Sequence, residues 1–187
     1  FHNGMSFGRD PGCTQRASMG EMVNIQGTKC ASVVSLELDG NTPNCNLLPP
    51  CVAQDYYQLA SDGVIAHSST YLEVTKVYSH HFGRDGFMLY KRQLAGCPYS
   101  TNMQYIQVNG LISEHNSRQG FSWVDGTDLT VDNRSFSHTG SVFYNNPGAG
   151  LDIEPDNGGT AQRGVFTKCK FEKNRVLGVI SDSPPTT

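Results

Sequence analysis

Apolar residues recur along the chain at fixed distances after a series of glycines. The glycines that begin this pattern are Gly63, Gly86, Gly120, Gly150 and Gly178. The next residue is apolar in all five places, and these residues are Val64, Phe87, Phe121, Leu151 and Val179. The third residue after the glycine is apolar in four of the five places, whereas the fourth is mostly polar. Because successive side chains of a strand face opposite sides, the pattern predicts short strands with positions one and three buried.

Two segments that contain these glycines are copies of one another. Val74–Phe87 and Val108–Phe121 align without a gap, at an offset of 34 residues, and share six identical residues. A third copy, Phe166–Val179, keeps the apolar positions and the Gly-Val ending. Repeats with a period of about 20–50 residues indicate stacked structural units. We therefore expect parallel strands stacked in register, with like residues above like.

The stacking pattern predicts an all-β domain. Helical periodicity is not found, and the regular register is not typical of a β-sandwich built from hairpins. We expect an irregular segment or a preceding coil of the stack at 1–21, stacked strands at 22–181 and a Pro-rich tail or linker at 182–187. Enrichment in Gly, Pro, Asn or Ser indicates inserted loops at 42–59, 91–102, 141–149 and 156–162.

Charge and composition narrow the classes of protein to be considered. Charged residues make up 17% of the chain, 20 of its 187 residues are Gly, and the net charge is −3. This balance suits an all-β protein with many tight turns, and it gives no indication of binding to nucleic acid or an anionic membrane. No apolar run reaches the length of a membrane span, and no signal peptide is found. Since the chain opens at Phe1, we expect a processed or excised segment of a longer polypeptide.

Six cysteines in a chain of this size favour an oxidising compartment, and hence a secreted or surface-associated protein. Cys45 and Cys51 flank a short Pro-containing loop and are expected to form a disulfide. Cys13 and Cys30 both precede the regular repeats and form the second expected pair.

Three further positions bear on the repeat register or on covalent modification. Cys169 falls where the other copies carry Val77 and Leu111, so a buried, reduced thiol is expected there. Arg134 falls at this same apolar position in the intervening repeat, which conflicts with the proposed register. Asn133 begins an Asn-Arg-Ser acceptor tripeptide for N-glycosylation, a pattern that also arises often by chance.

Several segments have a distinctive sequence, namely Leu36–Asn41 (LELDGN), the copies SHHFGRDGF and SEHNSRQGF, and Gly148–Asn157 (GAGLDIEPDN) followed by VFTKCKFEKN. With these segments the chain resembles the right-handed parallel β-helix, or pectate-lyase-like, superfamily. The resemblance covers roughly Val23–Ser181 and implies a right-handed parallel β-helix solenoid, like those of bacterial and phage proteins that act on polysaccharides. The motif set of polygalacturonases and the calcium-binding Asp cluster of pectate lyases are both missing. We expect no cofactor and no metal, since no Cys/His spacing resembles a zinc site.

Asp152 and Glu154 are the candidate catalytic residues. They are two positions apart on one predicted strand, so both should project outward with their Cα atoms about 6–7 Å apart. Side-chain freedom then allows the carboxyl separations of glycosidases, in which one acid protonates the leaving group and the other acts as base or nucleophile. Ser122 and Tyr90 on neighbouring strands, with Asp125 at the adjacent turn, should complete a sugar-binding surface. The alternative is that both acids only cap turns or face water.

A second constellation recurs at the repeat offset. His81 and Arg84 return as His115 and Arg118, so the two pairs are expected to stack. Histidine can take a proton and arginine can neutralise a carboxylate, which suits a polysaccharide lyase or the binding of an acidic glycan. The alternative is that repeats duplicate their turn residues, with the histidines bonded to the backbone and the arginine stems covering apolar edges. His138 continues the column without an arginine.

Three functions are consistent with these patterns. The first is an extracellular module that cleaves a polysaccharide, as a glycoside hydrolase or polysaccharide lyase, or binds one. The second is a non-catalytic structural segment of a secreted filament or surface appendage, with end-to-end self-assembly or homo-oligomer formation. The third is a glycan-binding adhesin. The expected partner is a polysaccharide or glycan, with no nucleic acid and no membrane insertion.

Overall fold

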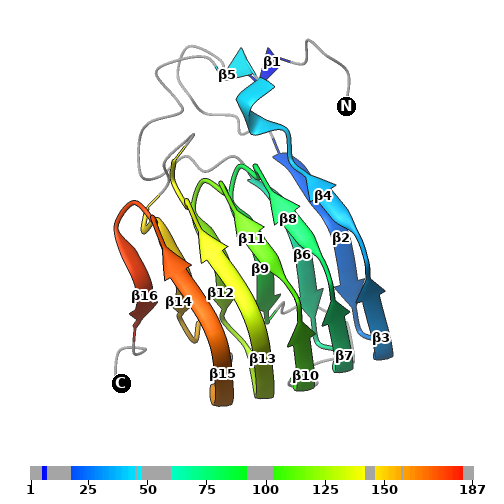
Figure 1. Cartoon of the computed structure of the whole chain (residues 1–187). Helices are drawn as coiled ribbons and strands as arrows, with labels where there is room; N and C mark the ends of the chain where they lie inside the picture. The colour runs from blue at the N-terminus through cyan, green and yellow to red at the C-terminus, as the bar shows by residue number, and fades with distance from the viewer. Residues whose placement is uncertain are drawn as a thin grey trace.

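The computed structural model describes residues 6–7, 18–44, 46–47, 60–91, 103–141, 146–156 and 158–182 (Figure 1). This part of the chain is mostly β-strand, and its helical structure is limited to a single 3₁₀ turn, η1 (Thr42–Asn44). The strands form two large sheets and one small sheet, and the paired strands are parallel throughout. The predicted all-β class is confirmed.

The first large sheet has six strands in the order β16-β14-β12-β9-β6-β2. These strands are β2 (Ser18–Gln26), β6 (Ala60–His67), β9 (Asp85–Tyr90), β12 (Gln119–Trp123), β14 (Ala149–Ile153) and β16 (Leu177–Ser181). A small separate sheet pairs β1 (Ser6–Phe7) with β5 (Asn46–Leu47).

The second large sheet has eight strands in the order β3-β7-β10-β13-β11-β8-β4, with β15 added against β13. They are β3 (Lys29–Val34), β4 (Glu37–Asp39), β7 (Thr70–Thr75), β8 (Tyr78–His80), β10 (Gln104–Asn109), β11 (Ile112–Glu114), β13 (Gly126–Ser137) and β15 (Ala161–Glu172).

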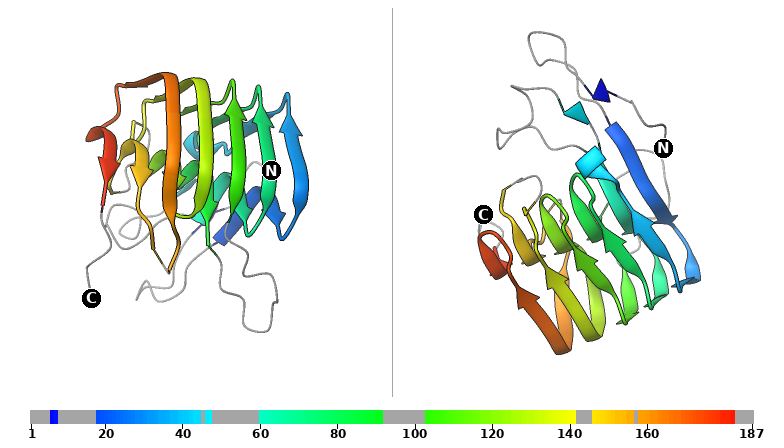
Figure 2. Two further views of the ribbon diagram at one scale, coloured as in Figure 1. Left: turned by 90° about the horizontal axis from the view of Figure 1, so that it is seen from below. Right: turned by 45° about the horizontal axis from the view of Figure 1, so that its top comes forward.

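The chain alternates between the two large sheets, and we call one such circuit a pass. From β6 the chain runs through β7 and β8 of the eight-stranded sheet and returns to the six-stranded sheet as β9. Strands β9, β10 and β11 form the next pass, β12 and β13 the one after it, and β14 and β15 the last complete one. Successive passes lie side by side, and the two sheets face each other (Figures 1 and 2).

The predicted ladder of apolar residues after the glycines is confirmed. Val64 pairs with Phe87, and Phe87 pairs with Phe121 on the next pass. Leu151 and Val179 continue the ladder on β14 and β16. The first four residues are at most 2% exposed, whereas Val179 is 45% exposed because β16 is an edge strand.

The three sequence copies are stacked in the register that their alignment predicted. Val74 pairs with Val108, Val108 with Val131, and Val131 with Phe166. Register on these strands places side chains of the same kind above one another, so the interior is a continuous apolar column between the sheets.

Arg134 occupies the apolar position without breaking the register. It pairs with Cys169 in the ladder between β13 and β15 and is 3% exposed. Its Nη2 donates to the backbone carbonyl of Val108 and, at 3.4 Å, to Oδ1 of Asn109. Burial lowers the pKa of Arg134 to about 10. A charged residue is tolerated here because its guanidinium reaches polar atoms of the neighbouring pass.

The cysteine expectations are met in part. Cys30 is exposed with a free thiol, which does not support its expected bond to Cys13. Cys169 is free as expected but only partly buried, because β15 pairs on one side alone in the described structure. Cys13, Cys45 and Cys51 lie outside the described residues, as does the side chain of Asn133.

Candidate functional site

The outer face of the six-stranded sheet carries a cavity of about 340 Å³. Its apolar lining consists of Ile65 on β6, Met88 on β9 and Val124 just after β12, and the rings of Tyr90 and His67 also line it. Its polar lining consists of Ser122, Arg84, Arg118, Glu21, Glu154 and Asp156. A concave surface that combines apolar walls with a few convergent polar groups is the usual form of a ligand site.

Each arginine of the cavity binds a buried carboxylate on the preceding pass. Arg84 donates from Nε to both oxygens of Asp62, at 2.9 and 3.1 Å, and from Nη2 to Oδ2. Arg118 donates from Nε to Oδ1 of Asp85 at 2.8 Å and from Nη2 to Oδ2. Burial alone would lower the pKa of Arg84, but its hydrogen bonds to Asp62 outweigh burial and hold the pKa above its ordinary value. Both arginines are therefore cationic and held in place.

A chain of hydrogen bonds links Arg118 and its partner Asp85 to the candidate acid Asp152. The Ser122 hydroxyl lies 2.9 Å from Oδ2 of Asp85 and 2.8 Å from Oε1 of Gln119. Gln119 in turn donates from Nε2 to Oδ2 of Asp152. This chain crosses three neighbouring passes, because β9, β12 and β14 are paired in the same sheet.

The two candidate carboxylates lie in different environments. Asp152 is 3% exposed, and within the described part of the chain its Oδ1 has no hydrogen-bond partner. Burial, followed by the charges of Glu154 and Asp85, raises the pKa of Asp152 to about 7. Glu154 is exposed and lines the cavity, and partial burial also raises its pKa. Asp152 is thus half protonated near neutral pH, and Glu154 is the carboxylate that reaches solvent.

The raised pKa of Asp152 predicts a pH-dependent stability difference between the protein and its Asp152→Asn variant. Between pH 4 and 7 the folded state keeps a proton that the unfolded state releases, so the free energy of unfolding falls as the pH rises through this window. Asparagine removes this penalty and can still accept the hydrogen bond from Gln119. The variant should therefore match the wild type near pH 4 and exceed it at pH 8 by on the order of 2–4 kcal/mol. Urea unfolding of both proteins at pH 4 and pH 8 measures the difference in their free energies of unfolding. The same difference at both pH values would contradict a raised pKa for Asp152.

The structure brings together most of the residues that the sequence singled out. Tyr90, Ser122, Arg84 and Arg118 all line the cavity beside Glu154. Asp125 does not line it: the residue is 1% exposed, and its carboxylate accepts hydrogen bonds from the backbone amides of Thr160 at 2.9 Å and Met103 at 3.5 Å. Asp125 therefore fastens the turn between β12 and β13 to the segments that carry Met103 and Thr160.

Sequence reasoning missed the polar residues directly before the repeating glycines. Gln119 pairs with Asp85 across β12 and β9, and Asp62 on β6 accepts the backbone amide of Asp85 at 3.0 Å. Each of the three contacts a cavity residue or Asp152. Their recurrence at one position of three successive repeats was a signal, because a buried polar side chain requires a hydrogen-bond partner. His67 was missed as well, and it contacts Tyr90 edge to face with ring centroids 5.7 Å apart.

The His/Arg column divides into two separate sites. The arginines face the cavity, whereas His81 and His115 stack on each other with ring centroids 5.1 Å apart. His138 continues the histidine column, 4.6 Å from His115. All three residues have φ between 55° and 57°, a left-handed conformation in which histidine is enriched. Burial lowers the pKa of His81 and of His115, with neighbouring histidines adding to the effect.

Comparisons with known proteins leave the family of the chain open. No family model matches it, and no curated protein or solved structure matches it either. Within the described residues, no helix is long and apolar enough to cross a membrane. The function must therefore be argued from the geometry of the cavity.

Proposed function

We propose that this chain is part of a secreted right-handed parallel β-helix that hydrolyses a polysaccharide along the outer face of its six-stranded sheet. The observation that carries the proposal is a pair of carboxylates two positions apart in the chain: Glu154 is exposed and lines the cavity, whereas Asp152 is buried, with a pKa near 7. Two acids whose environments differ in this way can divide into a proton donor and a base or nucleophile.

Three features support the solenoid. The paired strands are parallel, each pass visits both sheets, and like residues stack in register over successive passes. Strand, crossover and parallel strand connections are right-handed in nearly all proteins. Stacked passes of this kind present a long outer face, and a polymer is the substrate class that matches such a face.

In the proposed reaction, Glu154 faces the sugar from the cavity. Asp152 lies two positions earlier, on β14, which ends at Ile153. Alternate Cα atoms of extended chain are about 6–7 Å apart, and Asp152 supplies the protonated carboxyl of the pair. One acid protonates the leaving oxygen while the other activates water or attacks the anomeric carbon. Tyr90 and the apolar wall give the sugar ring a surface on which to stack.

Charge in the cavity favours a neutral glycan. Each arginine is already bonded to an aspartate, so the pairs Arg84–Asp62 and Arg118–Asp85 are close to neutral. A lyase needs a cation that is available to neutralise the carboxylate of its substrate, and these guanidiniums are committed elsewhere. Hydrolysis of a neutral polysaccharide is therefore preferred over elimination on an acidic one.

A polysaccharide panel tests the proposal. The purified chain is incubated with neutral and acidic polysaccharides, and both reducing ends and the absorbance of unsaturated products are recorded. We expect new reducing ends from a neutral polysaccharide without unsaturated products. Unsaturated products would show a lyase, and binding without products would show an adhesin.

A structural role is the second candidate, and one observation favours it. The last pass exposes large apolar side chains, namely Val165, Val176, Leu177 and Val179. Such a surface can stack on another pass of the same kind, as in an end-to-end filament. If the chain gives no products and binds no polysaccharide of the panel, the structural role is favoured over hydrolysis.

A further inference from the structure

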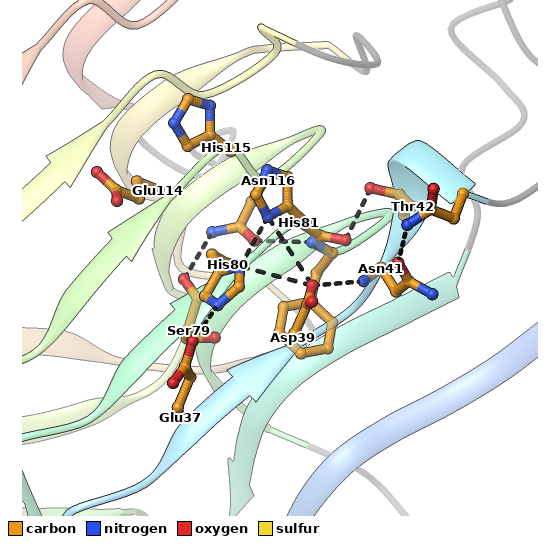
Figure 3. A network of polar contacts seen from close by, with 12 residues as sticks. Glu37, Asp39, Asn41, Thr42, Ser79, His80, His81, Glu114, His115 and Asn116 are labelled. Atoms are coloured by element: carbon orange, nitrogen blue, oxygen red, sulfur yellow. Dashed lines mark hydrogen bonds and ion pairs between the residues drawn. The ribbon is translucent and has the colours of Figure 1, made fainter. Parts of the chain in front are cut away.

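We infer that Asp39, His80 and His81 form a binding site for a transition-metal dication of the zinc type. The three residues come from two strands that are distant in sequence but paired in space, since Asp39 on β4 pairs with His80 on β8. His81 follows in the turn that leads to β9. Figure 3 shows the three side chains turned toward one another beside the segment that carries Thr42.

The three ligand atoms are spaced for one ion. Nδ1 of His80 lies 2.7 Å from Nδ1 of His81 and 3.5 Å from Oδ1 of Asp39, and the latter two atoms are 3.8 Å apart. A point equidistant from the corners of a triangle with these sides is about 2.0 Å from each corner, and zinc binds nitrogen and oxygen ligands at about 2.0–2.2 Å. An ion at this point contacts all three atoms without a change of backbone.

Glu37 directs the correct nitrogen of His80 toward the ion. Its Oε1 lies 3.3 Å from Nε2 of His80, on the opposite side of the ring from the cluster. When Nε2 donates its proton to this carboxylate, Nδ1 of the neutral ring carries a lone pair that points at His81 and Asp39. A carboxylate that bonds to the second ring nitrogen is the usual partner of a metal-bound histidine.

The surroundings hold the rings and leave one side open. The ring of Tyr78 lies 4.2 Å from that of His80, and the ring of His115 stacks on His81 at 5.1 Å. The His80 side chain is 8% exposed, whereas that of Asp39 is 52% exposed. Two fixed imidazoles, one carboxylate and an open position for water suit zinc or cobalt. Calcium and magnesium prefer sites built from oxygen ligands.

A neighbouring cluster provides the comparison within the same chain. Glu114, His115 and His138 also lie close together, but Nδ1 of His138 is 4.0 Å from Oε2 of Glu114. Their ring nitrogens lie near hydroxyls, with Nδ1 of His115 2.9 Å from Oγ of Ser141. The wider spacing and the hydroxyl partners make this cluster a weaker site than the one at Asp39.

The inferred site is independent of the proposed hydrolysis. His81 is outside the lining of the cavity and lies three residues before Arg84, in the same turn between β8 and β9. An ion would join β4 to this turn and stabilise both. The expected consequence is a rise in melting temperature with bound metal, whether or not the chain cleaves a polysaccharide.

Metal titration of the chelator-treated chain tests the inference. Zn²⁺ should bind at one ion per chain by calorimetry and raise the melting temperature. Co²⁺ should give the visible absorption of a low-coordinate nitrogen and oxygen site. Ca²⁺ should neither bind nor raise the melting temperature. Absence of Zn²⁺ and Co²⁺ binding, or preference for Ca²⁺, would overturn the inference.

Three substitutions locate the site. Asp39→Asn keeps an oxygen for the 2.8 Å hydrogen bond from the Asn41 amide, and His81→Asn keeps a residue that tolerates φ of 56°. Each should weaken Zn²⁺ binding by about 10- to 100-fold or more, while melting in chelator stays near the wild-type value. His138→Asn is the matched control, with φ of 55° in the same column, and should bind as the wild type does. If Asp39→Asn and His81→Asn bind Zn²⁺ with wild-type affinity, or if only His138→Asn loses Zn²⁺ binding, the site is not at Asp39, His80 and His81.

Discussion

Glu154→Gln is expected to lower turnover of the cleaved polysaccharide by at least about 100-fold, the lower end of what general acid–base groups contribute. Glu154 is the exposed member of the carboxylate pair and lines the cavity, so it is the group that meets the sugar. Glutamine keeps the size of the side chain but can neither accept a proton nor attack carbon. Initial rates from reducing ends measure the loss.

Asp152→Asn should cause a loss of similar size, with a diagnostic pH dependence. If Asp152 is the proton donor, wild-type activity falls as the pH rises through about 7, where this carboxyl ionises. The residual activity of the variant should lack that alkaline limb, because asparagine does not titrate.

The matched control for both variants is Glu73→Gln. Glu73 is an exposed strand glutamate on β7 of the eight-stranded sheet, outside the lining of the cavity. It should retain wild-type turnover. Full activity in Glu154→Gln or Asp152→Asn would remove that carboxylate from the reaction and favour the structural role.

Phe121→Asp is expected to unfold the protein. Phe121 is 0% exposed, and its ring lies 4.9 Å from that of Phe87 and 5.9 Å from that of Phe136, measured between centroids. Loss of a buried phenylalanine costs about 3–5 kcal/mol, and an unpaired buried carboxylate adds several more. The sum is comparable to the whole stability of a domain, about 5–15 kcal/mol.

Circular dichroism and thermal melting measure this outcome. Phe121→Leu is the control, since leucine already occupies the next rung at Leu151. It should fold with a loss of about 1–2 kcal/mol from the smaller side chain. A cooperative melt of Phe121→Asp within a few degrees of the wild type would mean that this position is not inside the stack.

Much of the candidate site followed from repeat arithmetic. Tyr90, Ser122 and Glu154 were grouped because they fall at fixed positions after a glycine, and strand pairing does bring their passes together. The mistake concerned direction. The repeat phase put His81 and Arg84 in one column. Only two residues of turn lie between them, but the histidine stacks on His115 whereas the arginine lines the cavity.

The roles of single polar groups could not be read from the spacing. Asp152 and Glu154 looked equivalent on one strand, yet one is buried and the other exposed, because burial depends on what covers the sheet. Asp125 looked like part of an acidic surface, but its oxygens accept backbone amides from two distant segments. The cluster of Asp39 with His80 also escaped notice, since residues 41 positions apart show no metal-ligand spacing.

Repeat spacing and side-chain alternation were enough to predict the strands, their register and the inward ladder, because a repeat forces like residues to stack and alternation assigns each to a face. Alternation also predicted that the two candidate carboxylates project outward, but the repeat spacing put the arginines in a separate column with the histidines. The electrostatics depend on the folded arrangement: which carboxylate is buried, which arginine is bound to which aspartate, and which ring nitrogens meet. These properties depend on distances of a few ångströms between passes, and the pattern along a chain does not encode such distances.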